Sequence, residues 1–454
     1  MAHLYIAATQ KSSGKTTLSI GLARELRRRG LAPRPFKKGP DYIDPLWLAQ
    51  ASGQTCFNLD FHTMARAEIH TLFARQLGAD LGLIEGNVGL FDDVDIAGST
   101  SNAELAKLLG APVVLVVDCH GMARGIAPLL LGYQAFDRDL RIAGVILNKV
   151  GSARHAGTLR RAVEHFTDLP VLGLVRRAEE IQIAERHLGL IPVNEAGQAE
   201  AQIEAIRAFV ADQVDVEAIL AVAATAAPPA AVPAPAPADR THAGLRIGIA
   251  RDEVFGFYYP DDLLAFAEAG AELVDFSPLH DADLPPVDAL FIGGGFPECR
   301  MADLEANRVL RAAVADFAAA GRPVYAECGG LMYLCRGLHW GERRAAMCGV
   351  LAADVAMHAR PRGHGYVRLR ETDVFPWPAT AGREVRAHEF HHSALIAPSP
   401  DWRYAYAVER GTGLDGRHDG VVQQRVLACY SHLRGVGGSD WPRRFLAYVA
   451  AARG

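Results

Sequence analysis

The sequence predicts an α/β protein built from two doubly wound domains. Short β-branched apolar runs alternate with helix-periodic segments in both halves of the chain, and each half begins with a new buried strand, at residues 4–8 and 245–250. An Ala/Pro-rich run separates the two series, and 454 residues are too many for one core. Strands that alternate with helices form βαβ units and parallel sheets, which bind ligands beyond the carboxyl ends of their strands.

The first strand leads into a loop that is typical of phosphate binding. Gly14 and Lys15 follow a small polar loop and precede a segment with helical spacing of leucines. Small residues let backbone N–H groups surround phosphate oxygens, and the helix N-terminus adds partial positive charge. In the P-loop pattern Lys15 reaches the β- and γ-phosphates and the Thr16 hydroxyl binds Mg²⁺, although Thr9 replaces the first glycine. The predicted nucleotide-binding residues are Ser12, Ser13, Gly14, Lys15, Thr16 and Thr17.

Two further segments of this half present carboxylates. A turn at Gly39 follows a predicted strand and brings Asp41 and Asp44 close together, beside two lysines. The run 80–93 contains a strand that ends at Glu85, where a Walker-B carboxylate would lie. Carboxylates beside a P-loop indicate Mg²⁺ ligands or a grip on substrate. For the two aspartates a plain surface turn is the alternative, since Asp is common in turns.

Three more strands complete the first half, at residues 112–118, 142–148 and 170–175. Their nearly continuous apolar character is typical of strands covered on both faces. A helix is predicted over 199–224, and the Ala/Pro run 227–238 that follows has no face that could pack, so it predicts a linker. The predicted domains are a P-loop domain at 1–225, a linker at 226–243 and a second α/β domain at 244–454.

The second half repeats the pattern and carries a different chemical site. Strands are predicted at 245–250, 272–276, 287–292 and 323–326, with helices at 261–269 and 301–320. Cys328 lies where the last of these strands meets a helix that begins near Gly330, which is the form of a nucleophile elbow. A lone buried cysteine is usually inert, but the elbow and the nearby glycines favour a nucleophile here. We expect the helix N-terminus to lower the pKa of this thiol.

A thiolate nucleophile also needs a base and support for an oxyanion. The backbone N–H groups of Gly294, Gly295 and Gly329 are the predicted oxyanion support. Among seventeen histidines, His432 is the predicted base, because it follows a late apolar strand.

The run His388-Glu-Phe-His-His392 matches the H-E-x-x-H zinc pattern by letter. That pattern binds zinc only on a helix, which places both histidines on one face. Extended-looking residues flank the run on both sides, so a zinc site is disfavoured. For residues 388–392 we expect a polar cluster that lines a substrate surface. Residues 358–364 are predicted either to contact an acidic substrate or to form a solvated loop, and the two interpretations are equally favoured.

Composition narrows the classes of protein. The net charge of −5 gives no sign of a nucleic-acid partner, and no apolar run reaches the length of a membrane span. Seven scattered cysteines without a C-x-x-C pair argue against a disulfide framework or a zinc ribbon. The chain starts in a strand without a signal-peptide pattern, so we expect a cytoplasmic protein without nucleic-acid or membrane partners.

The motifs, taken together and in order, resemble the cobyrinic acid a,c-diamide synthases of corrinoid biosynthesis over nearly the whole chain. Each motif alone is moderately specific, whereas eight in the right order are highly specific. The motifs are Ser13-Gly-Lys-Thr-Thr17, Lys38-Gly-Pro-Asp-Tyr-Ile-Asp-Pro45, Asn58-Leu-Asp60, Glu85-Gly-Asn-Val-Gly-Leu-Phe-Asp92, Glu185-Arg-His-Leu-Gly-Leu190, Gly293-Gly-Gly-Phe-Pro-Glu298, Glu327-Cys-Gly-Gly-Leu-Met-Tyr333 and His388-Glu-Phe-His391.

The resemblance implies a glutamine-dependent amidotransferase with a dethiobiotin-synthetase-like half and a class I glutaminase half. Cys328 would release ammonia from glutamine with His432 as base. ATP, a substrate, would phosphorylate the a and c carboxylates of the corrin ring, and ammonia would displace each phosphate. The implied cofactor is Mg²⁺, and the implied partners are ATP, glutamine and a corrinoid acid, with a homodimer left open. The implied metal ligands are Thr16, Asp44 and Glu85, and the implied substrate contacts are Asp41, Tyr42 and Asp92.

Two departures from the family pattern stand out. Residues 10–12 carry fewer glycines than many P-loops of the family, and Lys11 either contacts phosphate or points to solvent. Class I glutaminases usually have an acid two residues beyond the histidine, but Arg434 occupies that position, so the base would lack its orienting carboxylate. The alternatives are a sister enzyme acting on another tetrapyrrole acid such as nickel-sirohydrochlorin, a ligase with an inert C-terminal half, and a P-loop ATPase switch.

Overall fold

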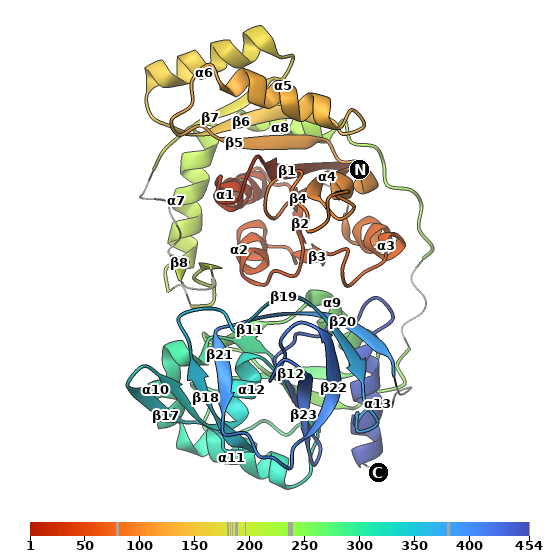
Figure 1. Cartoon of the computed structure of the whole chain (residues 1–454). Helices are drawn as coiled ribbons and strands as arrows, with labels where there is room; N and C mark the ends of the chain where they lie inside the picture. The colour runs from red at the N-terminus through yellow and green to blue at the C-terminus, as the bar shows by residue number, and fades with distance from the viewer. Residues whose placement is uncertain are drawn as a thin grey trace. The chain divides into compact units, whose positions relative to one another are not determined.

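The computed structural model describes residues 1–453 apart from 79–80, 179–180, 182, 184, 187–188, 196, 235–238 and 379–381. Asp80, residues 187 and 188 of the 185–190 motif, and residues 235–238 of the predicted linker therefore lie outside the described residues. The chain divides into two compact units, Met1–Ala234 and Pro235–Gly454, which Figure 1 shows and which are described separately below. The ends of the predicted linker at 226 and 243 stay a prediction.

The first unit is a parallel α/β sheet of seven strands in the order β3-β2-β4-β1-β5-β6-β7. This confirms the predicted doubly wound domain. Its elements are β1 (Ala2–Ala8), α1 (Lys15–Arg28), β2 (Pro33–Lys38), α2 (Ile43–Ser52), β3 (Phe57–Leu59), α3 (Arg66–Gln76), β4 (Leu81–Glu85), α4 (Asn102–Leu109), β5 (Val113–Asp118), α5 (Ile126–Phe136), β6 (Ile142–Val150), α6 (Ala153–Phe166), β7 (Val171–Arg176), the short hairpin β8 (Glu185–Arg186) and β9 (Gly189–Leu190), α7 (Ala199–Ala211) and α8 (Val216–Ala223).

Helices cover both faces of this sheet, because successive strand side chains point to opposite sides. Leu4 and Ile6 of β1 share one core with α1, α2, α7 and α8. On the other face Tyr5 donates a hydrogen bond to Asn102 of α4 over 2.8 Å, and the His3 ring meets Phe73 of α3 at 5.1 Å. Burial on both faces explains the nearly continuous apolar strands of the sequence.

The helix predicted over 199–224 is wrong in one respect, because the structure divides it into α7 and α8. Between the two helices, Val214 forms an antiparallel bridge with Gly173 of β7, and Asp215 N–H donates to Leu172 O over 2.8 Å. The Asp215 side chain then caps α8 by accepting from Ala218 N–H at 2.9 Å. The break therefore pairs an extended segment with the edge strand of the sheet.

The second unit contains a nine-stranded sheet in the order β12-β10-β13-β15-β24-β23-β22-β19-β20 and a four-stranded sheet in the order β17-β16-β18-β21. Its elements are β10 (Arg246–Ala250), β11 (Phe255–Phe257), α9 (Pro260–Glu268), β12 (Glu272–Phe276), β13 (Ala289–Ile292), β14 (Gly294–Gly295), η1 (Pro297–Arg300), α10 (Met301–Ala306), α11 (Arg308–Ala319), β15 (Val324–Glu327), α12 (Gly329–Leu334), β16 (Cys335–Trp340), β17 (Arg343–Ala346), β18 (Leu351–Met357), β19 (Gly363–Glu371), β20 (Glu384–His391), β21 (Ser393–Ile396), β22 (Arg403–Arg410), β23 (His418–Gln423), β24 (Val426–Cys429) and α13 (Trp441–Arg453).

This unit confirms an α/β domain, but it departs from the predicted pattern in two places. In the nine-stranded sheet, the neighbouring strands β12, β10, β13, β15 and β24 pair in parallel. Strands β23, β22, β19 and β20 extend this sheet with antiparallel pairing. The single helix predicted over 301–320 is interrupted at Asn307, which caps α11 by accepting from Leu310 N–H at 3.3 Å. The Asn307 amide also donates to Pro278 O and Asp281 O, so the interruption ties two loops together.

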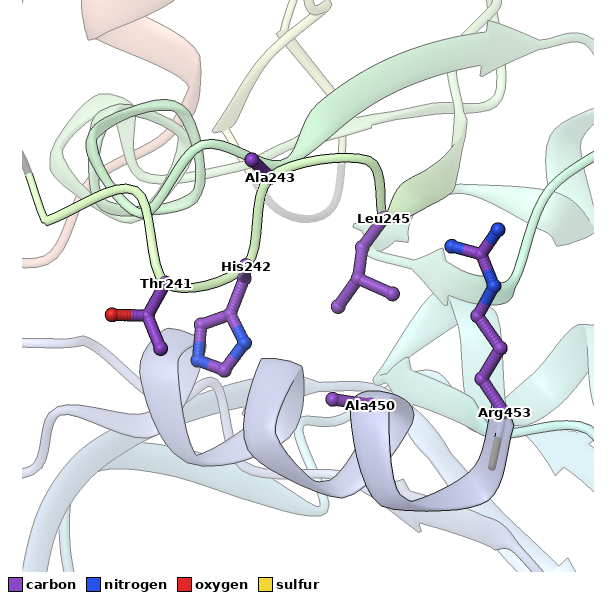
Figure 2. Close-up of a pocket in the computed structure, with 6 residues that line it drawn as sticks. All are labelled: Thr241, His242, Ala243, Leu245, Ala450 and Arg453. Carbon is purple, nitrogen blue, oxygen red and sulfur yellow. The ribbon is translucent and has the colours of Figure 1, made fainter.

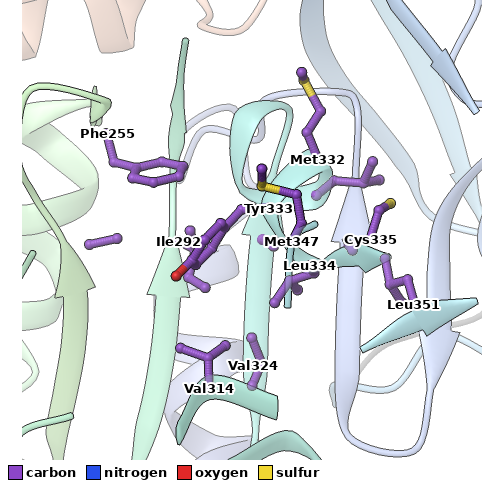
Figure 3. Close-up of a cluster of buried hydrophobic side chains, with 14 of the residues drawn as sticks. Phe255, Ile292, Val314, Val324, Met332, Tyr333, Leu334, Cys335, Met347 and Leu351 are labelled. Atoms are coloured by element: carbon purple, nitrogen blue, oxygen red, sulfur yellow. The ribbon is translucent and has the colours of Figure 1, made fainter. Parts of the chain in front are cut away.

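Two cores support the second unit. Figure 3 shows one of them, in which Tyr333 and Leu334 of α12 lie among Ile292, Val324 and other buried side chains of the sheet. This packing fixes the short helix that directly follows Cys328. On the other face, Trp441 of α13 is 1% exposed and contacts the ring of Tyr325 at 4.9 Å between centroids.

Trp441 generates a stability prediction for the second unit. Its indole N–H donates to Asp262 Oδ2 over 3.0 Å, and its ring fills the aromatic core. We expect Trp441→Ala to lower the free energy of unfolding by about 3–5 kcal/mol in urea denaturation followed by near-ultraviolet circular dichroism. The control Leu264→Ala, at a side chain 40% exposed on α9, should change it by less than about 0.5 kcal/mol. Equal effects of the two variants would contradict this account of the core.

Candidate functional site

The loop between β1 and α1 has the backbone of a phosphate cradle. Gly14 adopts φ 92° at the N-terminus of α1, and a Cβ placed on it would lie 2.3 Å from Asn148 Nδ2, so only glycine fits there. The Asn148 amide holds the loop by donating to Ser13 O over 2.8 Å. Ser12 and Ser13 therefore precede Gly14 in a fixed loop, and Thr17 lies in the first helical turn. Lys11 is exposed.

Lys15 is the buried cation of this loop. Lys15 is 7% exposed, and its Nζ donates a hydrogen bond to Val88 O over 2.9 Å. Burial lowers the pKa of Lys15 to about 8, and the charge of Lys37 adds to this, while Glu85, Asp44 and Asp92 act in the opposite direction. A polyphosphate bound at the loop would supply the negative charge that favours the protonated lysine.

A buried ion-pair cluster lies beside the loop, and it includes a residue that the sequence analysis did not single out as a site residue. Parallel pairing sets Lys37 of β2 opposite Glu85 of β4. The Lys37 Nζ lies 2.5 Å from Glu85 Oε1 and 2.5 Å from Asp44 Oδ2. Thr16 Oγ1 donates to the same two carboxylates, at 3.0 and 3.2 Å. Burial alone would lower the pKa of Lys37, but Asp44 and Glu85 raise it above its usual value, so the ammonium stays charged.

The structure therefore brings together Thr16, Asp44 and Glu85, the three predicted metal ligands. A hydroxyl and two carboxylates are the oxygen donors that Mg²⁺ prefers, and they lie at the end of the P-loop. Asp44 also stands in the first turn of α2, where the helix N-terminus favours negative charge. The donor set fits a magnesium ion that accompanies a nucleotide.

The predicted substrate residues occupy two loops around this cluster. Asp41 Oδ1 accepts from the N–H groups of Ile43 and Asp44, and Asn58 Nδ2 donates to Asp41 O over 2.7 Å, so the 39–44 loop is rigid. Burial and the neighbouring Asp44 raise the pKa of Asp41. Tyr42 is 8% exposed in the same loop. Asp92 accepts from Gly89 N–H at 2.9 Å in the loop after β4. Their contact with substrate stays a prediction.

In the second unit, Cys328 confirms the predicted elbow. It lies between β15 and α12 with φ 46° and ψ −102°, a left-handed backbone that is rare and strained for a non-glycine residue. Its N–H donates to Cys429 O over 2.8 Å and its carbonyl accepts from Met332 N–H at 3.0 Å. The strained turn is thus held on both sides, as nucleophile elbows are.

The expectation that the helix N-terminus lowers the pKa of this thiol is wrong for the ligand-free structure. Burial raises the pKa of Cys328 well above its usual value, and the charge of Glu298 adds to the rise. A hydrogen bond from Gly329 N–H acts in the opposite direction but is outweighed. Helix α12 has only six residues, so its terminus contributes little against these effects. The Cys328 thiol is therefore neutral, and a base would have to take its proton before the sulfur could act as a nucleophile.

Glycines allow His432 and the Cys328 elbow to lie close to the 293–295 loop, which follows β13. A Cβ on Gly294 would lie 2.6 Å from Cε1 of the His432 ring. A Cβ on Gly329 would lie 2.8 Å from Gly295 O and 2.9 Å from Gly295 N. Gly294 therefore lies against His432, and Gly329 of the elbow lies against Gly295, so the three predicted oxyanion glycines are close to one another and to the predicted base. Their binding of an oxyanion stays a prediction.

The expectation that His432 lacks a carboxylate partner is wrong. Glu327, directly before Cys328, places its Oε2 3.3 Å from His432 Nδ1. Arg434, at the position where an acid was sought, is 1% exposed and turns away, with its Nε 2.9 Å from Asp261 Oδ2 and its guanidinium 4.9 Å above the Tyr259 ring. The carboxylate comes from the preceding strand instead of from the histidine's own segment. A charged residue at the end of an otherwise apolar strand was the signal for it in the sequence.

The run 388–392 is largely buried, and the expectation that it lines a substrate surface stays a prediction. Residues 388–391 end strand β20, which excludes the helix that a zinc pattern needs. The described residues contain no group of three His, Cys, Asp or Glu side chains that could hold a metal ion. His388 is 6% exposed and stacks on His432 at 4.9 Å between ring centroids. His391 stacks on Tyr430 at 3.9 Å.

Figure 2 shows a surface hollow with a volume of about 320 Å³, away from these groups. It lies between the segment before β10 and the end of α13, within the second unit. Its lining includes no carboxylate and none of the predicted site residues; the lining residues are Thr241, His242, Ala243, Leu245, Ala450 and Arg453. The hollow therefore has no part in the chemistry described above.

The neutral thiol of Cys328 generates a prediction about its reactivity. Alkylation by iodoacetamide requires the thiolate, so its rate at Cys328 should keep rising with pH up to pH about 9 without a plateau near neutrality. The measurement is peptide mass spectrometry after timed alkylation, with the partly exposed Cys299 as internal reference in the same sample. A rate at Cys328 that is already constant between pH about 6 and 8 would show a resting thiolate and contradict the structure.

Family models and named relatives agree with the two centres. Residues 4–191 match the CobQ/CobB/MinD/ParA nucleotide binding domain, and residues 246–436 match the CobB/CobQ-like glutamine amidotransferase domain. The cobyrinate a,c-diamide synthase of Magnetococcus marinus is 45% identical over 99% of this chain and 97% of its own length. The enzyme of the same name from Archaeoglobus fulgidus is 41% identical over 97% of this chain and 96% of its own length. With both domains and the full length matched at this identity, the chain belongs to the cobyrinate a,c-diamide synthase family.

Proposed function

We propose that this chain is an ATP- and glutamine-dependent ligase that amidates the a and c carboxylates of cobyrinic acid, or of its cobalt-free analogue hydrogenobyrinic acid, in cobalamin biosynthesis. The observation that carries the proposal is the full-length match to enzymes with this name. Two reactive centres within one chain support it, because amide synthesis from glutamine needs one site that releases ammonia and one that activates a carboxylate.

The second unit would perform the glutaminase step. His432 takes the proton of the Cys328 thiol, and the sulfur attacks the carboxamide carbon of glutamine. The C–N bond breaks, the proton passes from His432 to the leaving amine, and ammonia departs from a γ-glutamyl thioester. Water then releases glutamate. Backbone N–H groups of Gly294, Gly295 and Gly329 would stabilise the oxyanion of each tetrahedral intermediate.

The first unit would activate the carboxylate. ATP would bind with its phosphates in the loop 12–17, where Lys15 and the N-terminus of α1 supply positive charge. A substrate carboxylate oxygen forms a bond to the γ-phosphorus while ADP leaves, and ammonia then attacks the acyl carbon and expels phosphate. Asp41 and Tyr42 would contact the corrinoid acid from the rigid loop before α2, and Asp92 from the loop after β4.

Thr16, Asp44 and Glu85 would hold the magnesium ion of the nucleotide. When bound, the ion neutralises the charge that develops on the phosphate oxygens. Lys37 already places a positive charge among these carboxylates, so the cluster would remain paired when nucleotide is absent. The ammonium offsets part of the cost of burying Asp44 and Glu85, which is the role we assign to Lys37.

The partners in this proposal are ATP, glutamine and the corrinoid acid. Neither a nucleic acid nor a membrane takes part, and a homodimer and a cytoplasmic location are part of the same proposal. Across the described ranges of the chain, no helix combines the length and the apolar character that crossing a bilayer would take.

The first test separates the two centres. Cys328→Ala should hydrolyse no glutamine and should still convert cobyrinic acid to the diamide when ammonium chloride and MgATP are supplied. Wild type should use either nitrogen source, with products followed by mass spectrometry. If wild type hydrolyses no glutamine, with or without MgATP and cobyrinic acid, the proposed function fails. If Cys328→Ala keeps glutamine-dependent amidation, Cys328 is not the nucleophile.

A second prediction concerns the first unit alone. Glu85→Gln removes one carboxylate of the cluster and should lower amidation by at least about 100-fold with either glutamine or ammonium as nitrogen source. Glutaminase activity of the same variant should persist, since Glu85 lies in the other unit. The measurement compares both activities at several Mg²⁺ concentrations. Unchanged amidation in Glu85→Gln would exclude this residue from the metal site.

A further inference from the structure

Glu327 occupies an unusual position for a charged side chain. It is the last residue of β15, it is 2% exposed, and it directly precedes the nucleophile. Parallel pairing sets it opposite Cys429 of β24, the strand that leads to His432. A carboxylate is costly to bury, so it persists only where donors satisfy it.

Its two oxygens have different partners. Oε1 accepts a hydrogen bond from the Tyr325 hydroxyl and another from Leu433 N–H at 2.9 Å. Oε2 faces His432 Nδ1 at 3.3 Å. One carboxylate thus holds both the imidazole ring and the backbone of the residue after it.

Glu327 is the carboxylate that the structure places at the His432 ring. The ring also stacks on His388 of β20, at 4.9 Å between ring centroids. Arg434 forms an ion pair with Asp261 over 2.9 Å. The Tyr259 hydroxyl lies 3.1 Å from His388 Nδ1, one residue further away.

We infer that Glu327 is the positioning residue of the glutaminase centre, which holds His432 in the tautomer that can accept the thiol proton. An imidazole that donates its Nδ1–H to a carboxylate leaves Nε2 unprotonated, and Nε2 is then free to act as base. The inference rests on the proposed glutaminase function and extends it. The carboxylate that orients His432 is supplied by Glu327, the residue before the nucleophile. Arg434, at the position where glutaminases usually carry an acid, forms an ion pair with Asp261 instead.

The two donors on Oε1 make Glu327→Gln a sharp test. Tyr325 O–H and Leu433 N–H would keep the amide oxygen of the new side chain on their side. Its NH₂ group would then face His432 Nδ1 and donate to it, which moves the ring proton to Nε2. The base would be blocked while the side chain keeps its size and its hydrogen bonds.

We expect Glu327→Gln to lower kcat for glutamine hydrolysis by about 10³-fold, with KM for glutamine changed by less than about threefold. Ammonium-dependent amidation should be unchanged, and Glu327→Asp should recover at least about tenfold of the loss. The matched control is Glu371→Gln, at another buried carboxylate of the same unit, which pairs with Arg444. It should leave glutamine hydrolysis within about threefold of wild type.

Nitrogen-15 NMR of histidine-labelled full-length chain reads the tautomer directly. The His432 signals, identified by their loss in His432→Gln, should show the proton on Nδ1 in wild type and on Nε2 in Glu327→Gln. A proton on Nε2 in wild type would overturn the inference, even if Glu327→Gln did not fold. Wild-type glutaminase activity in Glu327→Gln would overturn it as well, whereas an inactive wild type would count against the proposed function instead.

Discussion

In both units, neighbouring parallel strands end at the same edge of the sheet, because their backbone hydrogen bonds fix the register between them. The register sets Lys37 opposite Glu85 in the first unit and Glu327 opposite Cys429 in the second. Charged side chains at these strand ends are buried, so each must have a partner on the adjacent strand or loop. The two reactive centres are consequences of this pairing, since every other group is placed relative to these strand ends.

The two centres solve the cost of buried charge in different ways. The first unit surrounds one ammonium with two carboxylates and a hydroxyl, which is a set that also suits a divalent cation. The second unit keeps its thiol neutral and surrounds one carboxylate with neutral donors and an imidazole. A paired charge costs much less than an isolated one, and in both centres the partner is a group that can change its role when substrate arrives.

Local patterns were enough to predict much of this from the sequence. Glycine and lysine spacing predicted the loop 12–17, and a strand followed by small residues predicted the elbow at Cys328, because both depend on a few consecutive residues. The interruptions at Val214 and Asn307 were missed, since pairing with a distant strand or loop outweighed helical periodicity there. Lys37 and Glu327 were missed for a related reason. One partner of each, Glu85 for Lys37 and His432 for Glu327, is distant in sequence, and only the fold brings these pairs together.

The expected lowering of the Cys328 pKa was wrong because burial and the nearby carboxylates of Glu298, Glu327 and Asp419 outweigh a six-residue helix, and neither effect is visible in a local motif. The central claim is that the two centres act in one reaction. Wild-type chain supplied with MgATP, cobyrinic acid and glutamine labelled with nitrogen-15 at its amide tests this claim directly, by mass spectrometry of the corrinoid product. The account predicts two labelled amide nitrogens in each diamide molecule. A product that carries no label, or hydrolysis of glutamine and ATP without any amidated corrinoid, would contradict it.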